Sequence, residues 1–325
     1  MDGAGLGRKK AAKVITKWPQ VLGYDVGKNL APAVRYLAED MGLGREGAAK
    51  VVTALPQVLG YSVEDNIAPK VRYLEEELGL GRAGAVKLIT KFPQVLSCSA
   101  EDNIAPKLKY LEEEVGLGRA GAVKVVTKFP CVLGLSVEQN LAPKVRYLAE
   151  VVGLGRDGAA KIIIKYPPVL GLSVEDNLAP EVKFLAEEAG AGRNGAADII
   201  LAYPTLLGSR IDSKLRPTLR FLEEHFPDTS NTAIMANLAT LSLAGRLVPR
   251  VRLLKWNGQV GRFAASTIGC FTNETFCEKV GITLEEYKNE VAECVREHAE
   301  KHSGPEANGG GGSGGGGASA GEIYR

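Results

Sequence analysis

The chain has 325 residues, of which 45% are hydrophobic and 24% are charged, and its formal net charge is +2. This length and composition can bury a sizeable core in one or two domains. No apolar run of the ~18 residues that a membrane helix needs occurs, and the N-terminus lacks the apolar segment of a secretory signal. Five cysteines without a CxxC pair favour a reducing compartment.

The sequence repeats itself with a period of 37 residues, which is marked by two series of prolines. One series defines six copies, numbered here from the N-terminus: Pro19, Pro56, Pro93, Pro130, Pro167 and Pro204. The other runs from Pro32 to Pro217 with the same step. Residues 4–24 resemble only the second half of a copy, so we expect the protein to extend further upstream.

Each complete copy is expected to begin with an amphipathic helix. In the third copy, Ser62 and Asp65 have the spacing of a capping box, and Asn66 can also cap a helix. Pro69 is tolerated in a first turn, and Gly79 is a typical helix stop. The predicted buried stripe of this helix consists of Val71, Leu74 and Leu78.

A second helix is expected after Gly81 and Arg82. It has to end before Pro93, since the residue that precedes a proline avoids helical angles, and Pro93 suits the start of a short third piece. Gly84 and its equivalents predict close approach between neighbouring helices. One such unit cannot bury its own apolar face, so the copies should stack into an all-α solenoid, right- or left-handed.

Three segments are expected along the chain. Residues 1–226 form the regular array, whose first copy is incomplete, and residues 227–302 hold degenerate terminal repeats around Pro249 and a polar capping helix. Residues 303–325 have the composition of a disordered Gly/Ser-rich tail.

The repeat resembles that of the mTERF (mitochondrial transcription termination factor) family. The resemblance rests on a proline followed three residues later by leucine, as in Pro56 and Leu59, and then on an N-x-A-P-K-V-x-Y-L helix. Residues 242–254 (SLAGRLVPRVRLL) are similar to the C-terminal signature of that family. The resemblance implies a left-handed superhelix of three-helix repeats whose basic concave groove binds double-stranded DNA or RNA. It also implies a mitochondrial or chloroplast location and a role in transcription termination or regulation, or in RNA processing.

Paired lysines on the second helix are the main candidate site. Two lysines four positions apart lie on one helix face, although like charges at this spacing destabilise a helix by roughly 0.2–0.5 kcal/mol. Such a ladder could neutralise phosphates, or it could serve solubility alone. The pairs are Lys13 and Lys17, Lys87 and Lys91, Lys124 and Lys128, and Lys161 and Lys165.

A second basic region lies near the C-terminal signature and contains Trp256. We expect Trp256, beside Leu253 and Leu254, to pack in the core, and the alternative is stacking on an exposed base. The candidate nucleic-acid contacts in this region are Arg216, Arg246, Arg250, Arg252 and Lys255.

Other basic residues have simpler explanations. Arg72 with Glu76, and its equivalents, are opposite charges four apart and describe a solvated helix face. Lys70, Lys107 and Lys144 form a column that the sequence assigns equally well to structure or to binding.

No catalytic constellation is visible, so we predict that the chain is not an enzyme and needs no cofactor, metal or small-molecule substrate. Cys294, His298 and His302 fall at steps of four on one predicted helix, but three ligands in a line suit tetrahedral metal binding poorly. The leading hypothesis is a monomeric nucleic-acid-binding solenoid of organellar gene expression. The alternative is a protein-interaction solenoid for an acidic partner.

Overall fold

The computed structural model describes residues 7–226, 243–259, 261–263, 267–268 and 271–302, and all regular structure in these ranges is helical. These residues fall into two units, 7–219 and the part from Arg220 onward. No helix in the described ranges combines the length and the apolar composition that crossing a bilayer requires.

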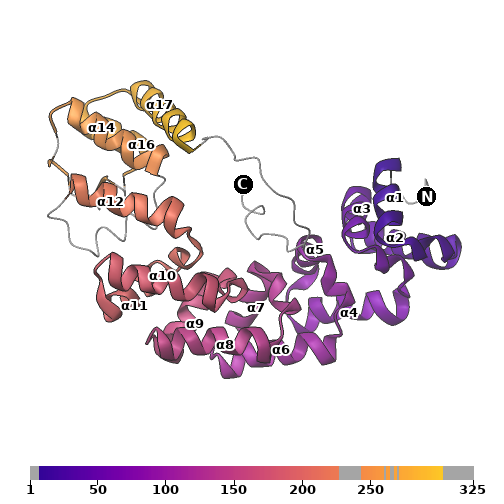
Figure 1. The fold of residues 1–325 in the computed structure, drawn as a ribbon. Coiled ribbons are helices and arrows are strands. Elements are labelled where there is room, and N and C mark those ends of the chain that lie inside the picture. The colour runs from indigo at the N-terminus through magenta and orange to yellow at the C-terminus, as the bar shows by residue number, and fades with distance from the viewer. Residues whose placement is uncertain (1–6, 227–242, 260, 264–266, 269–270, 303–325) are drawn as a thin grey trace, which may run out of the picture. The chain divides into compact units, whose positions relative to one another are not determined.

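The first unit is the predicted solenoid, with copies of three helices in sequence order (Figure 1). The first helix of each complete copy has a π-helical turn, a short α-helical segment and a second π-helical turn. Their bounds are η3 Val26–Leu30, α2 Ala31–Arg35 and η4 Tyr36–Asp40; η6 Val63–Ile67, α4 Ala68–Arg72 and η7 Tyr73–Glu77; η9 Ala100–Ile104, α6 Ala105–Lys109 and η10 Tyr110–Glu114; η12 Val137–Leu141, α8 Ala142–Arg146 and η13 Tyr147–Val151; η15 Val174–Leu178, α10 Ala179–Lys183 and η16 Phe184–Glu188.

The second and third helices are equally regular. The second helices are α1 Arg8–Lys17, α3 Gly44–Ala54, α5 Gly81–Lys91, α7 Gly118–Lys128, α9 Gly155–Lys165 and α11 Gly192–Ala202. The third helices are 3-10 helices: η2 Pro19–Gly23, η5 Pro56–Gly60, η8 Pro93–Ser97, η11 Pro130–Gly134, η14 Pro167–Gly171 and η17 Pro204–Gly208.

Local sequence signals explain where the first helix begins and ends. The Oγ of Ser62 accepts a hydrogen bond from the backbone N–H of Asp65 at 3.0 Å and donates to the Asp65 carboxylate at 2.9 Å, so Ser62 caps the helix as predicted. The prediction that Asn66 caps the helix was wrong, because Asn66 lies inside the helix and accepts a hydrogen bond from Lys70. Gly79, with φ +68°, ends the helix as predicted.

The glycine column of the second helix makes room for side chains that pack against it. A Cβ atom on Gly84 would lie 2.8 Å from the Cβ of Leu80, which precedes the same helix. A Cβ atom on Gly121 in this column would also meet a neighbouring copy, at 3.4 Å from Ile164. The glycine makes room for a leucine four residues upstream, and at Gly121 the neighbouring helix approaches closely as predicted.

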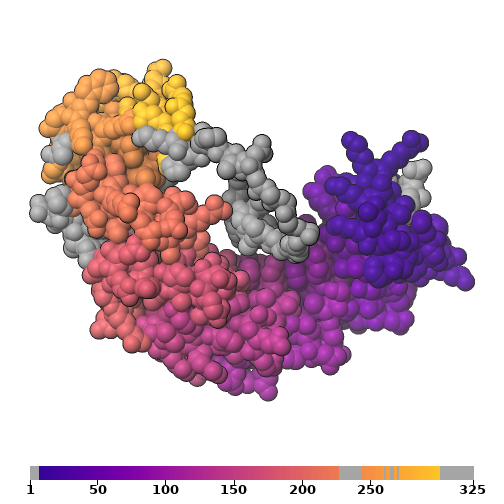
Figure 2. Space-filling view, in the orientation of Figure 1, coloured from indigo at the N-terminus to yellow at the C-terminus, as the bar shows by residue number. Residues whose placement is uncertain are grey.

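The core of the first unit continues from copy to copy. Leu74 and its equivalents Leu37, Leu111, Leu148 and Leu185 are all fully buried. The predicted stripe of Val71, Leu74 and Leu78 is likewise at most 3% exposed. In the space-filling view, the copies from α1 to α11 form one continuous body (Figure 2).

The second unit packs helices around its own core. Its elements are the end of α12 Arg216–His225, η19 Leu243–Leu247, α14 Val248–Trp256, α16 Asn273–Val280 and α17 Leu284–His302. The core includes Leu253, Leu254, Phe276 and Tyr287. The predicted capping helix is thus two helices, separated at Gly281 with φ +81°. Residues 227–242 and the predicted tail 303–325 lie outside the described residues.

Candidate nucleic-acid interface

Most consecutive second helices of the first unit lie next to one another. Helix α1 contacts α3, α3 contacts α5, α7 contacts α9, and α9 contacts α11. Equivalent residues of these helices therefore recur along one surface. This arrangement is what a ladder of repeated contacts requires.

The predicted lysine pairs lie on the solvent side of this row of second helices. All eight lysines are exposed, whereas Leu88, Ile89 and their equivalents cover the opposite side of the helix and are buried. Two members reach the next copy: the Nζ of Lys17 donates to the carbonyl of Thr53 at 3.2 Å, and the Nζ of Lys165 to that of Leu201 at 3.0 Å. These contacts direct the side chains along the row.

The second and sixth copies interrupt the ladder. Lys50 occupies the first lysine position of the second copy, but it forms an ion pair with Glu46 at 3.3 Å, and Ala54 replaces the second lysine. In the sixth copy the two positions hold Asp198 and Ala202. Lys50 was missed from the sequence, although the period of 37 residues places it in the column of Lys13 and Lys87.

Arginines at the start of several second helices stabilise contacts within and between copies. The guanidinium of Arg82 lies 2.6 Å from the carboxylate of Glu75, and Arg119 makes the same contact with Glu112. Arg193 donates to the carbonyl of Val151 in the preceding copy at 2.8 Å, where the first helix ends. Cations at a helix C-terminus are favourable, so this column stabilises contacts within and between copies.

The lysine column on the first helix is structural. Lys107 and Lys144 are only 8% exposed, and Lys70 is half-buried. Their ammonium groups donate to the carbonyls of the third helix, as Lys70 does to Leu96 at 2.6 Å. Burial lowers the pKa of all three lysines. The exposed pair of Lys109 with Glu113 at 4.0 Å represents the solvated face predicted for this helix.

Arg216 is held by acidic side chains of its own unit. Its guanidinium forms ion pairs with Glu188 at 2.7 Å and with Asp212. Two carboxylates thus neutralise this candidate contact from the predicted basic region.

Arg250 lies in the core of the second unit with 0% exposure. It donates to the carbonyl of Ile268 at 2.5 Å and to Asn273 at 2.9 Å, and it lies over the rings of Phe276 and Tyr287. A guanidinium that is fully enclosed and hydrogen-bonded organises the core. It does not reach solvent.

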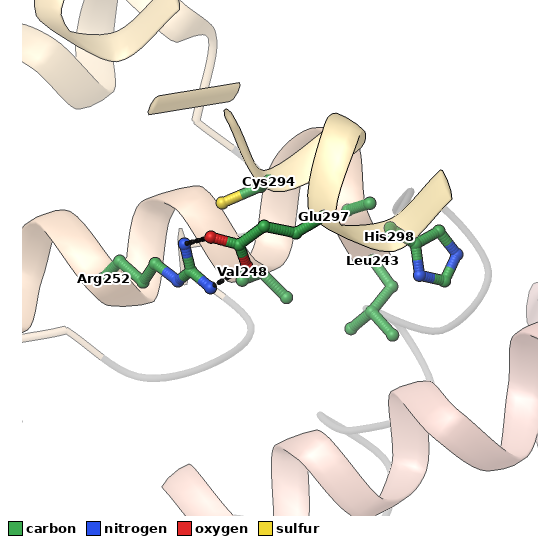
Figure 3. Close-up of a pocket in the computed structure, with 7 residues that line it drawn as sticks. Leu243, Val248, Arg252, Cys294, Glu297 and His298 are labelled. Carbon is green, nitrogen blue, oxygen red and sulfur yellow. Dashed lines mark hydrogen bonds and ion pairs between the residues drawn. The ribbon is translucent and has the colours of Figure 1, made fainter. Parts of the chain in front are cut away.

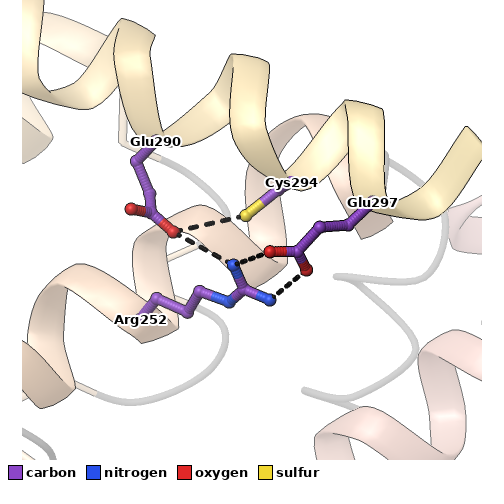
Figure 4. Close-up of polar contacts among 4 residues, drawn as sticks. All are labelled: Arg252, Glu290, Cys294 and Glu297. Atoms are coloured by element: carbon purple, nitrogen blue, oxygen red, sulfur yellow. Dashed lines mark hydrogen bonds and ion pairs between the residues drawn. The ribbon is translucent and has the colours of Figure 1, made fainter. Parts of the chain in front are cut away.

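Arg252 belongs to a polar cluster between α14 and α17. It forms a bidentate pair with Glu297 at 2.6 and 3.1 Å and a longer contact with Glu290 at 3.4 Å (Figure 4). The thiol of Cys294 donates to Glu290, and burial, reinforced by this hydrogen bond, raises the pKa of the thiol to about 12. The thiol is therefore protonated at neutral pH and is a poor nucleophile.

A small cavity of about 160 Å³ adjoins this cluster (Figure 3). Its lining is apolar on the side of Leu243 and Val248 and polar at Arg252, Glu297 and His298. Cys294 and His298 come from the line of ligands considered for a metal, and the side chain of His302 lies outside the described residues. Among the side chains that the structure describes, no three His, Cys, Asp or Glu residues are arranged so that they could hold a metal ion.

The remaining candidates of the second unit reach solvent. Arg246 is partly exposed, and Lys255 is exposed, with its Nζ 3.0 Å from the Nε2 of His225. Burial, with a smaller contribution from Lys255, lowers the pKa of His225. Trp256 is 81% exposed, so the prediction that it packs in the core was wrong. Its place at the last residue of α14 leaves the ring beyond the packed turns.

Comparison with known proteins supports the resemblance seen in the sequence. The mTERF family model matches the chain twice, over residues 1–225 and residues 113–276. No curated protein matches the chain. The two overlapping matches cover most of the 325 residues and include both the repeat array and α14. The chain belongs to the mTERF family.

Proposed function

We propose that this protein binds the phosphate backbone of nucleic acid in organellar gene expression, through the exposed lysine pairs of its second helices. The observation that carries the proposal is the row of neighbouring helices with eight exposed lysines on it. Membership of the mTERF family suggests a nucleic-acid-binding role in mitochondria or chloroplasts. Transcription termination or regulation, or RNA processing, is the proposed context, and no catalytic activity is proposed.

The proposed contact surface is narrower than the set of candidate residues from the sequence. It comprises the eight lysines of the first unit, and Arg246 and Lys255 are separate candidate contacts on the second unit. Three arginines are left out. Arg216 and Arg252 form ion pairs with acidic side chains, and Arg250 is buried and donates to a backbone carbonyl.

Uneven charge along the row sets the proposed footprint. The third, fourth and fifth copies each present a complete lysine pair, whereas in the second copy Glu46 neutralises Lys50 and Ala54 stands in place of the second lysine. Asp198 makes the sixth copy unfavourable for a polyanion. The main contact is therefore proposed for the third to fifth copies, with Lys13 and Lys17 as a separate contact.

A salt series tests the proposal. Each lysine that neutralises a phosphate of duplex DNA releases counterions, and the logarithm of the binding constant falls by roughly 0.9 per contact for each tenfold rise in salt. The combined Lys87→Gln, Lys91→Gln, Lys124→Gln and Lys128→Gln variant should flatten this slope by up to about 3.6. Binding of duplex DNA, duplex RNA and single-stranded RNA would be followed by fluorescence anisotropy.

The matched control removes the same number of cations from the first helices. Arg72, Lys109, Arg146 and Lys183 are all exposed, and their replacement by glutamine changes the net charge equally. This control should keep most of the slope. An equal loss of slope in both variants would refute the assignment of the site, and absent or salt-insensitive binding by the unchanged protein would refute the proposed function.

The rival function, a scaffold for an acidic protein partner, predicts a different result. Binding would then be absent for all three nucleic acids. We further propose that the protein acts as a monomer, which sedimentation analysis at the concentrations used for binding would check.

A further inference from the structure

At one buried position of the first helix, the sixth copy carries a different kind of side chain from the three copies before it. In the third to fifth copies, a lysine on the first helix donates to the carbonyl 26 residues ahead on the third helix: Lys70 to Leu96, Lys107 to Leu133 and Lys144 to Leu170. The same column of the sixth copy holds Glu181 on α10. By the same step, the equivalent acceptor is the carbonyl of Leu207 on η17.

Glu181 is enclosed and incompletely hydrogen-bonded. It is 3% exposed, and its Oε2 is buried without a hydrogen-bond partner. The backbone N–H of Ser209 donates a hydrogen bond to the carboxylate of Glu181, and this bond lowers the pKa of Glu181. A buried carboxylate with an unsatisfied oxygen is costly, whereas the neutral carboxyl has an O–H to donate.

The elements around Glu181 bring no cation to it. Helix α10 packs against η15, η16 and η17, and η17 carries no titratable side chain. On α10 itself Lys183 is exposed and points to Glu187, at 3.8 Å. The other charged groups on these elements are acidic and exposed: Glu175, Asp176 and Glu188.

We propose that Glu181 makes closure of the sixth copy pH-sensitive: its neutral carboxyl joins α10 to η17, and loss of the proton to water loosens the two elements. In the neutral form the O–H donates to the Leu207 carbonyl, in the place where the other copies use an ammonium group. In the ionised form two acceptors face each other and the donor is gone. Copies closed by lysine lack this response.

The sign of the effect follows from the two states of the group. Burial raises the pKa of Glu181 from 4.5 to about 8, with a smaller opposing contribution from the N–H of Ser209. Between these values the closed copy binds the proton and the opened copy does not, so raising the pH favours opening. The stabilisation is complete below pH 4.5, is lost as the pH approaches 8, and changes no further above it.

Hydrogen exchange of the full chain between pH 6 and 9 tests the proposal. Exchange would be followed by mass spectrometry and divided by the intrinsic rate at each pH. Protection of residues 179–189 and 204–209 should fall by up to ~10-fold per pH unit until about pH 8 and then level off. The equivalent peptides of the fifth copy, 142–152 and 167–172, should show no such fall.

Two variants separate the role of Glu181 from general alkaline loosening. Glu181→Gln stays neutral and keeps a donor, so protection of the sixth copy should become independent of pH. Lys144→Glu should transfer the pH-dependent loss to the fifth copy. Three results would each overturn the proposal. They are pH-independent protection of the sixth copy in the unchanged chain, an equal fall of protection in all copies, and an unchanged fall of protection in the Glu181→Gln variant. The comparison of protection between the sixth and fifth copies of the unchanged chain tests the proposal even if a variant does not fold.

Discussion

Lys107 and Lys124 lie in the same copy, and their surroundings give them different roles. Lys107 is 8% exposed and donates to the carbonyl of Leu133 and to Asn103, whereas Lys124 is exposed on the second helix. A buried ammonium group loses its hydration, and hydrogen bonds within the protein have to compensate for this loss. An exposed ammonium group remains available to an anion. The column within the repeat therefore decides between stability and binding.

Replacing Lys107 by methionine should destabilise the first unit. The carbonyl of Leu133 would lose its donor inside the protein, and an unsatisfied buried acceptor costs ~1–3 kcal/mol. Urea denaturation followed by circular dichroism would measure the change. The matched control is Lys109→Met on the same helix, where the side chain is exposed and pairs only at 4.0 Å with Glu113. The control should stay within ~0.5 kcal/mol, and an equal effect of both variants would contradict the structural role.

Sequence periodicity predicts a residue's column but not the depth at which that column lies. The lysine pairs could be placed on one face of a helix from their spacing of four residues. The division between Lys70, which bonds to Leu96, and Lys87, which is exposed, needed the third helix in place. Arg250 was beyond such reasoning, because the groups that enclose it come from α16 and α17, far along the chain. Trp256 shows the converse error, since adjacent leucines did not predict its exposure.

At the scale of single elements, helix limits followed from proline, glycine and serine. These residues act through their own backbone angles or through hydrogen bonds to the next turn, so their effect is local and predictable. The role of Gly84 was not predictable, because the position of the leucine it accommodates depends on the loop in which Gly79 and Gly81 adopt positive φ angles. The existence of elements was thus easier to predict than the contacts between them.

The second helix of the second copy offers a test by gain of function. Ala54→Lys combined with Glu46→Gln would complete its lysine pair and release Lys50 from its ion pair. The row would then present complete pairs from the first to the fifth copy. If the proposed interface is correct, duplex binding should tighten and the salt slope should steepen by up to about 1.8, the value for two added phosphate contacts.

The control for this gain adds the same charge to a first helix. Ala31 and Glu39 are both exposed on the first helix of the second copy, so Ala31→Lys with Glu39→Gln changes the net charge equally. Equal gains in both variants would show that net charge, and not the row of second helices, sets the affinity. No gain in either variant would place the second copy outside the contact.

At the scale of the whole molecule, the period of 37 residues made the solenoid predictable. Each copy buries its apolar stripe against its own helices and those of its neighbours, so contacts are short-range in sequence and recur with the repeat. The second unit has no such repetition. Its core joins Leu253, Phe276 and Tyr287 from three helices, and that combination carries no periodic signal.

A solenoid of this kind should respond locally to a cavity in its core. Leu111 is fully buried in the fourth copy, and its replacement by alanine should cost ~2–5 kcal/mol. Stability of a repeat array is approximately a sum of copy and nearest-neighbour contributions, so the loss should be largest in the third to fifth copies and smaller in the first. The second unit has a core of its own and should keep its stability. Hydrogen exchange by mass spectrometry, read copy by copy, measures this profile. Equal loss of protection in every copy and in α16 and α17 would mean that the chain unfolds as one cooperative body, and the nearest-neighbour description would then fail.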